Sequence, residues 1–80
     1  MTKLTSMRVE RIEAGLTLAG LGRLVGLDET GLSRVERGQR TLDAEQADRV
    51  AAVLGVSADH LFTEQGGRFV VTPMRLAATA

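Results

Sequence analysis

The sequence predicts a compact all-α domain, and two observations carry this prediction. Of the 80 residues, 44% are hydrophobic but only Phe62 and Phe69 are aromatic, so the core has to be built from aliphatic side chains. Glycine commonly ends helices in the left-handed conformation. Four glycines divide residues 4–62 into five short segments with helical features, at positions 15, 26, 38 and 55. A chain of this length forms one domain with a modest core.

The first two helices are assigned from their caps and their apolar spacing. The first is expected over about residues 6–14, capped by Thr5 or Ser6, with Met7 and Ile12 facing inward. The second begins after Thr17 as N-cap. Its apolar residues recur at helical spacing: Leu18, Leu21, Leu24 and Val25. A glycine within so short a helix, Gly22, indicates close approach of another helix.

The third helix is expected over residues 29–37, with Asp28 as its cap. Only Leu32 and Val35 would face inward, and Gly38 ends the helix. Its remaining surface is polar. This segment therefore combines a narrow apolar stripe with an unusually wide polar face.

The last part of the chain starts with the clearest helical pattern. A capping box of Asp43 with Gln46 heads a helix over residues 44–54. A short fifth helix follows and runs through Phe62. After a break of two glycines, residues 68–72 are β-branched and aromatic, which is typical of a strand.

Composition excludes several classes of function. The chain has no cysteine, so disulfides and thiolate metal sites are absent, and the lone histidine, His60, has no second ligand to share a metal. We find no glycine-rich phosphate loop and no carboxylate cluster with metal spacing, so no enzyme, cofactor or small-molecule ligand is expected. No apolar run is long enough to span a membrane, and the N-terminus lacks the pattern of a signal peptide. We therefore expect a cytoplasmic protein.

The charge pattern gives mixed evidence on nucleic acid as a partner. Ten basic and ten acidic residues leave a formal net charge of zero, which counts against DNA because phosphates are bound largely by Lys and Arg. However, Arg34, Arg37 and Arg40 lie within one short stretch. Arginine is the better residue for bidentate contacts to guanine or phosphate, and the distribution of charge matters more than its total.

The second and third segments together have the form of a helix-turn-helix unit, two short helices joined by a turn around glycine. The second helix of such a unit needs one narrow apolar stripe to hold it to the domain and a free polar face for base edges. The third segment of this chain meets both requirements. Its polar residues near the N-terminal end are the ones that would face DNA.

At these residues the sequence resembles the lambda-repressor/Cro-like (XRE-type) helix-turn-helix family. The resemblance covers about residues 7–62, and its most specific part is Ser-Arg-Val-Glu-Arg-Gly at 33–38. It also includes Gly26-Leu-Asp28 and Leu54-Gly-Val-Ser57. The resemblance implies a five-helix lambda-repressor-like fold over residues 1–63, with residues 64–80 as a short C-terminal extension.

The family pattern also implies roles for individual residues. The base-reading positions are occupied by Glu29, Thr30, Ser33 and Arg34. The positions that contact the DNA backbone are occupied by Thr17, Arg37, Gln39 and Arg40. Arg11 and Glu36 match a pair that forms an internal salt bridge and holds the recognition helix in place.

The sequence departs from the family at the start of the second helix. Leu18 stands where the family usually has a glutamine that touches the DNA backbone, so one expected contact is lost. Leu18 is then either exposed or packed against a neighbour. Together with the neutral net charge and Glu29, this departure favours an alternative, a protein-interaction module that kept the fold and lost DNA binding.

The family resemblance implies a bacterial or phage-encoded transcription regulator that binds a palindromic operator in double-stranded DNA as a homodimer. A repressor or autoregulator is expected, of the phage Cro, restriction–modification controller or antitoxin type. The expected dimer surface is C-terminal: His60, Leu61, Phe62, Phe69, Val70 and Val71. A strand at 68–72 would have an unpaired edge that a second copy could fill. Alternatively, this segment folds back on its own domain or is a flexible tail.

Overall fold

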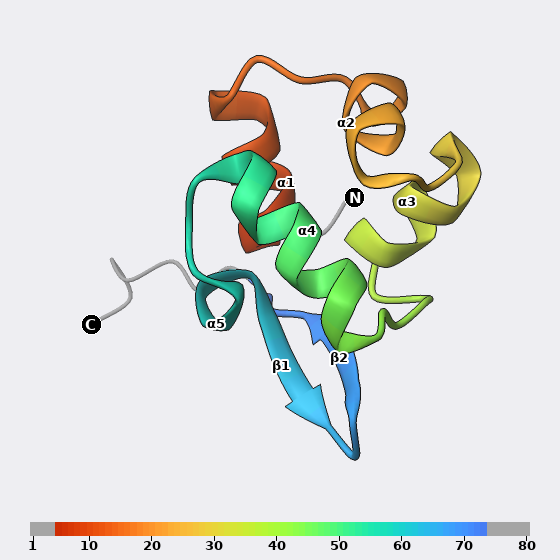
Figure 1. Cartoon of the computed structure of the whole chain (residues 1–80), viewed down its shortest axis with the longest axis vertical. Coiled ribbons are helices and arrows are strands. Elements are labelled where there is room, and N and C mark those ends of the chain that lie inside the picture. The colour runs from red at the N-terminus through yellow and green to blue at the C-terminus, as the bar shows by residue number, and fades with distance from the viewer. Residues whose placement is uncertain (1–4, 74–80) are drawn as a thin grey trace.

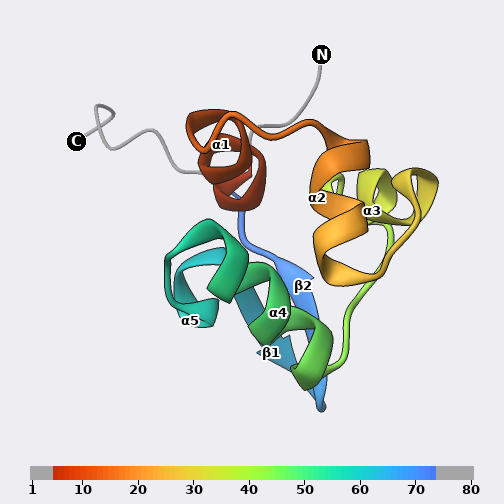
Figure 2. The same ribbon diagram turned by 45° about the horizontal axis from the view of Figure 1, so that its top comes forward.

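The computed structural model of the chain describes residues 5–73 and contains five helices followed by a β-hairpin (Figure 1). The elements are α1 (Ser6–Glu13), α2 (Leu18–Val25), α3 (Glu29–Glu36), α4 (Ala44–Leu54), α5 (Ala58–Leu61), β1 (Phe62–Gln65) and β2 (Arg68–Val71). Figures 1 and 2 both show α2 and α3 together on one side, α5 on the other, and α4 between them. The five-helix fold with a short strand near residues 68–72 is confirmed.

The core is aliphatic, as the composition predicts, with one phenylalanine. Its buried hydrophobic residues are Met7, Leu21, Val25, Leu32, Val35, Leu42, Ala47, Val50, Ala51, Leu61, Phe62 and Val71. They come from all five helices, both strands and the loop before α4. The fold is therefore held by a single core that the hairpin helps to close.

Two residues expected to face inward are exposed. Ile12 is 54% exposed and Leu24 is 60% exposed. On α1, Met7 defines the buried face, and a residue five positions later is turned about 140° away from it. Arg11 instead occupies the inward position one turn after Met7. On α2 the buried stripe is formed by Leu21, Gly22 and Val25, and Leu24, about 60° from Leu21, lies outside it.

Most helix starts have the caps that the sequence predicts. The Thr17 hydroxyl of α2 accepts from the backbone N–H of Gly20 at 2.9 Å. Asp43 and Gln46 form the reciprocal capping box of α4, with bonds of 2.8 and 3.3 Å. Asp28 differs from the prediction, because it occupies the N-cap position of α3 but its side chain accepts no capping hydrogen bond.

The hairpin is antiparallel and its register runs from Phe62 opposite Val71 to Gln65 opposite Arg68. Two glycines, at positions 66 and 67, form the turn with φ of 60° and 83°. Tight two-residue hairpin turns need such positive φ values, which glycine adopts without a steric penalty. The turn sequence therefore explains why the chain reverses at this point.

The structure corrects the expectation of an unpaired edge on the second strand. β2 pairs with β1 on one side, and on the other side Phe69 exchanges two backbone hydrogen bonds with Leu42, at 2.9 and 2.8 Å. On this edge the backbone groups of Phe69 are thus already used within the chain. The segment thus folds back on its own domain, which was the stated alternative.

The hairpin also forms part of the same folded unit as the helices. The side chain of Val71 lies in the core, and Pro73 forms a β-bridge with Thr5 before α1. A boundary between residues 63 and 64 would cut through β1. The remainder of the expected extension, residues 74–80, lies outside the described residues.

Three of the six residues expected at a dimer surface are buried within the chain. Leu61, Phe62 and Val71 are 0%, 3% and 5% exposed, so their side chains fill the core and are not presented to a partner. His60 is exposed and its Nε2 lies 2.9 Å from a carboxylate oxygen of Glu10. The other two, Phe69 and Val70, are half-buried.

Candidate nucleic-acid interface

The α2–α3 pair is shaped by a tight turn at Gly26, whose φ of 76° ends α2 in the left-handed conformation. The backbone N–H of Leu27 then donates to the carbonyl of Gly22 at 2.9 Å. A Cβ atom at Gly22 would lie 2.4 Å from the Leu27 carbonyl oxygen. The close approach at Gly22 is thus made by the turn and not by another helix, which corrects the prediction. This glycine allows α3 to follow α2 so tightly.

The α3 helix is amphipathic in the way the sequence predicts. Leu32 and Val35 are fully buried and attach the helix to the core. The opposite side carries the four residues expected to read bases: Glu29, Thr30 and Arg34 are exposed, and Ser33 is half-buried. The structure therefore brings these four side chains onto one helix of two turns, on its solvent side.

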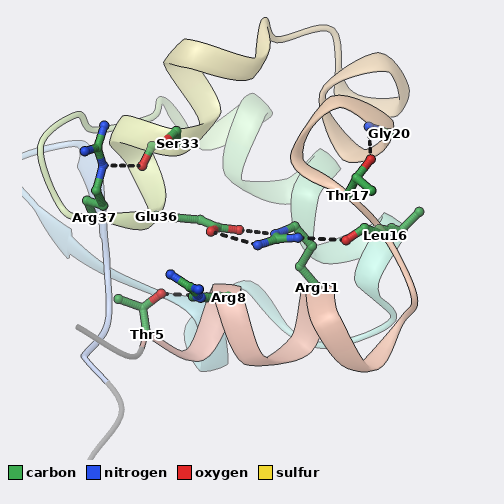
Figure 3. A network of polar contacts seen from close by, with 9 residues as sticks. All are labelled: Thr5, Arg8, Arg11, Leu16, Thr17, Gly20, Ser33, Glu36 and Arg37. Carbon is green, nitrogen blue, oxygen red and sulfur yellow. Dashed lines mark hydrogen bonds and ion pairs between the residues drawn. The ribbon is translucent and has the colours of Figure 1, made fainter. Parts of the chain in front are cut away.

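An ion pair between Arg11 and Glu36 joins α1 to the end of α3, as Figure 3 shows. The Nε and Nη2 atoms of Arg11 donate to the two carboxylate oxygens of Glu36, with an Nη2–Oε1 distance of 3.3 Å. The third nitrogen, Nη1, donates to the backbone carbonyl of Leu16 at 2.7 Å. The two charged side chains are only 11% and 5% exposed. The pair therefore ties α1, the loop before α2 and α3 together, and it leaves the outer face of α3 free.

The residues expected to contact the DNA backbone lie in two places. Arg37, Gln39 and Arg40 are exposed in the loop after α3. The Nε of Arg37 donates back to the carbonyl of Ser33 at 3.4 Å. Thr17 is exposed at the N-terminus of α2, where backbone N–H groups and the helix dipole favour an anion.

Arg40 has a neighbour that sequence reasoning did not assign. A Cβ atom at Gly31 would lie 2.4 Å from Nη1 of Arg40 and 2.7 Å from Oδ1 of Asp28. The Arg40 side chain thus crosses back over the first half of α3, beside the base-reading positions. The sequence feature that could have indicated this contact is Gly31 within an eight-residue helix, because a side chain at position 31 would displace the Arg40 guanidinium.

Leu18 is half-buried and packs against the core. The sequence left open whether Leu18 is exposed or packed against a neighbour, and the structure shows that it is packed. The leucine side chain thus contributes to the attachment of α2 to the core.

The described part of the chain has little else that suggests a chemical site. Between residues 5 and 73, no group of three or more His, Asp or Glu side chains could hold a metal ion, and no pocket is present. None of the helices in this range is long and apolar enough to cross a membrane. The exposed face of the α2–α3 pair and the loop that follows it are the clearest candidate for a binding surface.

A sequence profile of the helix-turn-helix family matches residues 7–61. The chain belongs to the helix-turn-helix family. The matched range covers α1 to α5 and includes every residue assigned above to base reading and backbone contact. The resemblance to lambda-repressor/Cro-like (XRE-type) proteins is confirmed by this match.

Two solved structures of similar helix-turn-helix fold are transcription regulators by name. One is the clp gene regulator ClgR from Corynebacterium glutamicum, with 30% identity and a TM-score of 0.64 over 68% of this chain and 57% of that chain. The other is the hypothetical transcription factor NHTF from Neisseria, with 37% identity and a TM-score of 0.63 over 68% of this chain and 61% of that chain.

A curated relative has a different name. Cyanate hydratase of Prochlorococcus marinus (strain NATL2A) is 43% identical over 47 residues. This match covers 59% of the present chain but only 32% of that protein. The helix-turn-helix chain thus spans about a third of this relative and about three-fifths of each solved structure.

Proposed function

We propose that this helix-turn-helix protein is a transcription regulator that binds double-stranded DNA by inserting α3 into the major groove. The observation that carries the proposal is the division of α3 into two sides. Its inner side is fixed by Leu32, Val35 and the buried Arg11–Glu36 pair, while its outer side is polar and open. A helix that reads base edges has to be held rigidly from behind in this way.

The proposed base contacts come from the outer side of α3. Arg34 would read guanine through its O6 and N7 acceptors, which a guanidinium can engage with two parallel hydrogen bonds. Glu29 would accept from a cytosine amino group, and Thr30 and Ser33 can donate to or accept from either kind of base. All four residues lie on the same two turns of helix.

The proposed phosphate contacts flank these positions. Thr17 lies at the N-terminus of α2, and the loop after α3 provides Arg37, Gln39 and Arg40. Phosphate contacts fix the register of a protein on the duplex but carry no sequence information directly. Arg34, Arg37 and Arg40 are gathered on one side of the fold, on α3 and in the loop that follows it. The net charge of zero is therefore compatible with DNA binding, because the distribution of charge matters more than its total.

We further propose a bacterial or phage-encoded repressor or autoregulator, located in the cytoplasm, that binds a palindromic operator as a homodimer without a cofactor. The fold similarity to two proteins named as regulators supports a binding protein rather than an enzyme. Two-fold dimers double the number of base contacts, and a single module of this size contacts few base pairs. Three residues of the proposed dimer surface keep accessible atoms: His60, Phe69 and Val70.

Selection of bound sequences from a random duplex pool tests the proposal directly. The expected result is an enriched site with two inverted half-sites about one helical turn apart. Affinity for the selected duplex is then measured between about 50 and 200 mM salt, where phosphate contacts produce a steep decline. Absence of binding at ~50 mM salt would rule out the DNA proposal.

The solution mass of the full chain, with and without DNA, tests the homodimer. A truncation after Pro73 preserves the β-hairpin and asks whether residues 74–80 contribute to association. A longer truncation that begins at Gly66 would remove Val71 from the core and confound folding with association. A chain that stays monomeric both free and on its operator would contradict the dimer proposal.

A second candidate is a protein-interaction module that has kept the fold without binding DNA. The similarity to a segment of cyanate hydratase favours it, since related sequence occurs inside a protein that is not named as a regulator. Leu18 and Glu29 also favour it, because the first removes a polar group and the second is repelled by phosphates. Absence of duplex binding at ~50 mM salt, by a chain that is folded, would support this candidate.

A further inference from the structure

The β-hairpin brings one arginine next to the loop that follows α3. Arg68, the first residue of β2, donates from Nε to the hydroxyl of Thr41 at 2.9 Å. Thr41 directly follows Arg40, the last of the proposed phosphate ligands in that loop. Thus a residue far along the chain and outside the family match, which ends at residue 61, lies beside the proposed DNA surface.

The position of Arg68 is fixed by the backbone as well as by this side-chain bond. The loop after α3 meets β2 at Leu42, which forms an isolated β-bridge with Phe69. Leu42 and Phe69 exchange two backbone hydrogen bonds, and a Cβ atom at Gly38 would lie 3.9 Å from Val71. The loop and the strand are therefore joined by backbone hydrogen bonds, and Arg68 has a defined place relative to α3.

Strand alternation shows which way Arg68 points. Phe69 and Val71 are the more buried pair on β2, and Leu42 is fully buried on the adjoining loop. Successive side chains of a strand point to opposite faces. Arg68 and Thr41 therefore lie together on the outer face of the small sheet, and Arg68 is exposed there.

The charge of Arg68 has no acidic partner in the described part of the chain. The three ion pairs within residues 5–73 are formed by other residues. Asp43, the acidic residue that follows Leu42, uses its carboxylate to cap α4. Because Thr41 holds Nε and no carboxylate forms an ion pair with Arg68 in the described residues, the guanidinium is oriented and can accept a fixed anion outside the protein.

We propose that Arg68 binds a backbone phosphate of duplex DNA, adjacent to the phosphates bound by the loop of residues 37–41. The proposal rests on the DNA-binding function proposed above and extends it to the hairpin. The continuous phosphate backbone is the anion that would lie next to that loop. Thr41 acts as a positioning residue, because it orients the guanidinium through its hydroxyl.

The test measures the affinity of variants of the full chain for the selected duplex and for a random duplex. Arg68→Gln is expected to weaken binding to both duplexes about equally, by roughly 3- to 10-fold. It should also lower the slope of log affinity against log salt by about 0.9, the value for one phosphate contact. Thr41→Val keeps the charge and removes the acceptor, so a smaller loss with an unchanged slope is expected.

Arg49→Gln is the matched control. It removes the same charge from an exposed arginine on α4 that pairs with Glu45. Its expected effect on affinity is less than 2-fold, since one screened charge away from the duplex contributes little. Melting temperatures of all variants are measured without DNA, so that a loss of folded protein is recognised.

Two results would overturn the inference. One is an Arg68→Gln variant that binds with the wild-type salt slope. The other is a loss of affinity that only follows a lower melting temperature, which would make Arg68 a structural link between hairpin and loop. Failure of the DNA-binding function itself is distinguishable, because the wild-type chain would then not bind duplex at ~50 mM salt.

Discussion

Removal of the Glu36 carboxylate should destabilise this protein more than any single surface substitution. In Glu36→Ala, Arg11 loses both of its carboxylate acceptors and retains only the bond to the Leu16 carbonyl. Arg11 is 11% exposed, so water can compensate little of the loss. Breaking one side of a buried ion pair typically destabilises by about 3–5 kcal/mol.

That magnitude is large for a chain of this size. A typical stability of ~0.05–0.15 kcal/mol per residue gives roughly 4–12 kcal/mol for the whole protein. Each kcal/mol shifts the melting temperature of such a domain by about 4–8 °C. Glu36→Ala should therefore lower the melting temperature by at least ~12 °C.

The assay is urea unfolding followed by circular dichroism, with a double-mutant cycle over Arg11→Met and Glu36→Leu. Each single variant should lose several kcal/mol, and the double variant should recover much of the loss, because an apolar pair leaves no unpaired charge. The control is Arg49→Ala, which breaks the exposed pair with Glu45 and should cost only about 0.3–0.5 kcal/mol. If Glu36→Ala costs no more than this control, the ion pair does not anchor α3 and the reasoning is refuted.

Three further substitutions test other parts of the structure. Gly22→Ala should destabilise by about 1–3 kcal/mol, because its Cβ would meet the Leu27 carbonyl oxygen, and a urea midpoint equal to wild type would contradict the tight turn. Asp43→Ala removes the capping box with Gln46 and should cost about 1 kcal/mol in thermal unfolding, whereas an unchanged melting temperature would mean that the cap contributes nothing. Arg34→Ala should leave stability near wild type and lose ~1–3 kcal/mol of discrimination at one operator position, measured with single-base variants of the selected site. Equal losses on every sequence would instead make Arg34 a phosphate ligand.

The sequence alone determined the helices and the family. Caps, glycine stops and apolar spacing act over a few residues, so α4 and its capping box were predicted with their observed bounds. The stripe of Leu32 and Val35 was likewise visible, because the two residues repeat at helical spacing. These features depend on residues that are close together in the sequence, so they can be predicted without knowledge of the fold.

The tertiary structure decided which residues are buried and which distant segments of the chain are in contact. Ile12 and Leu24 were predicted to be inside and are exposed, since short helices dock through stripes whose direction depends on their neighbours. The strand at 68–71 was predicted, but its partners were not, because hydrogen bonds to β1 and Leu42 join residues that no local pattern links. The same long-range pairing places Arg68 beside Thr41 at the end of the α3 loop. Contact between distant segments depends on how the whole core packs, and only the folded structure shows it.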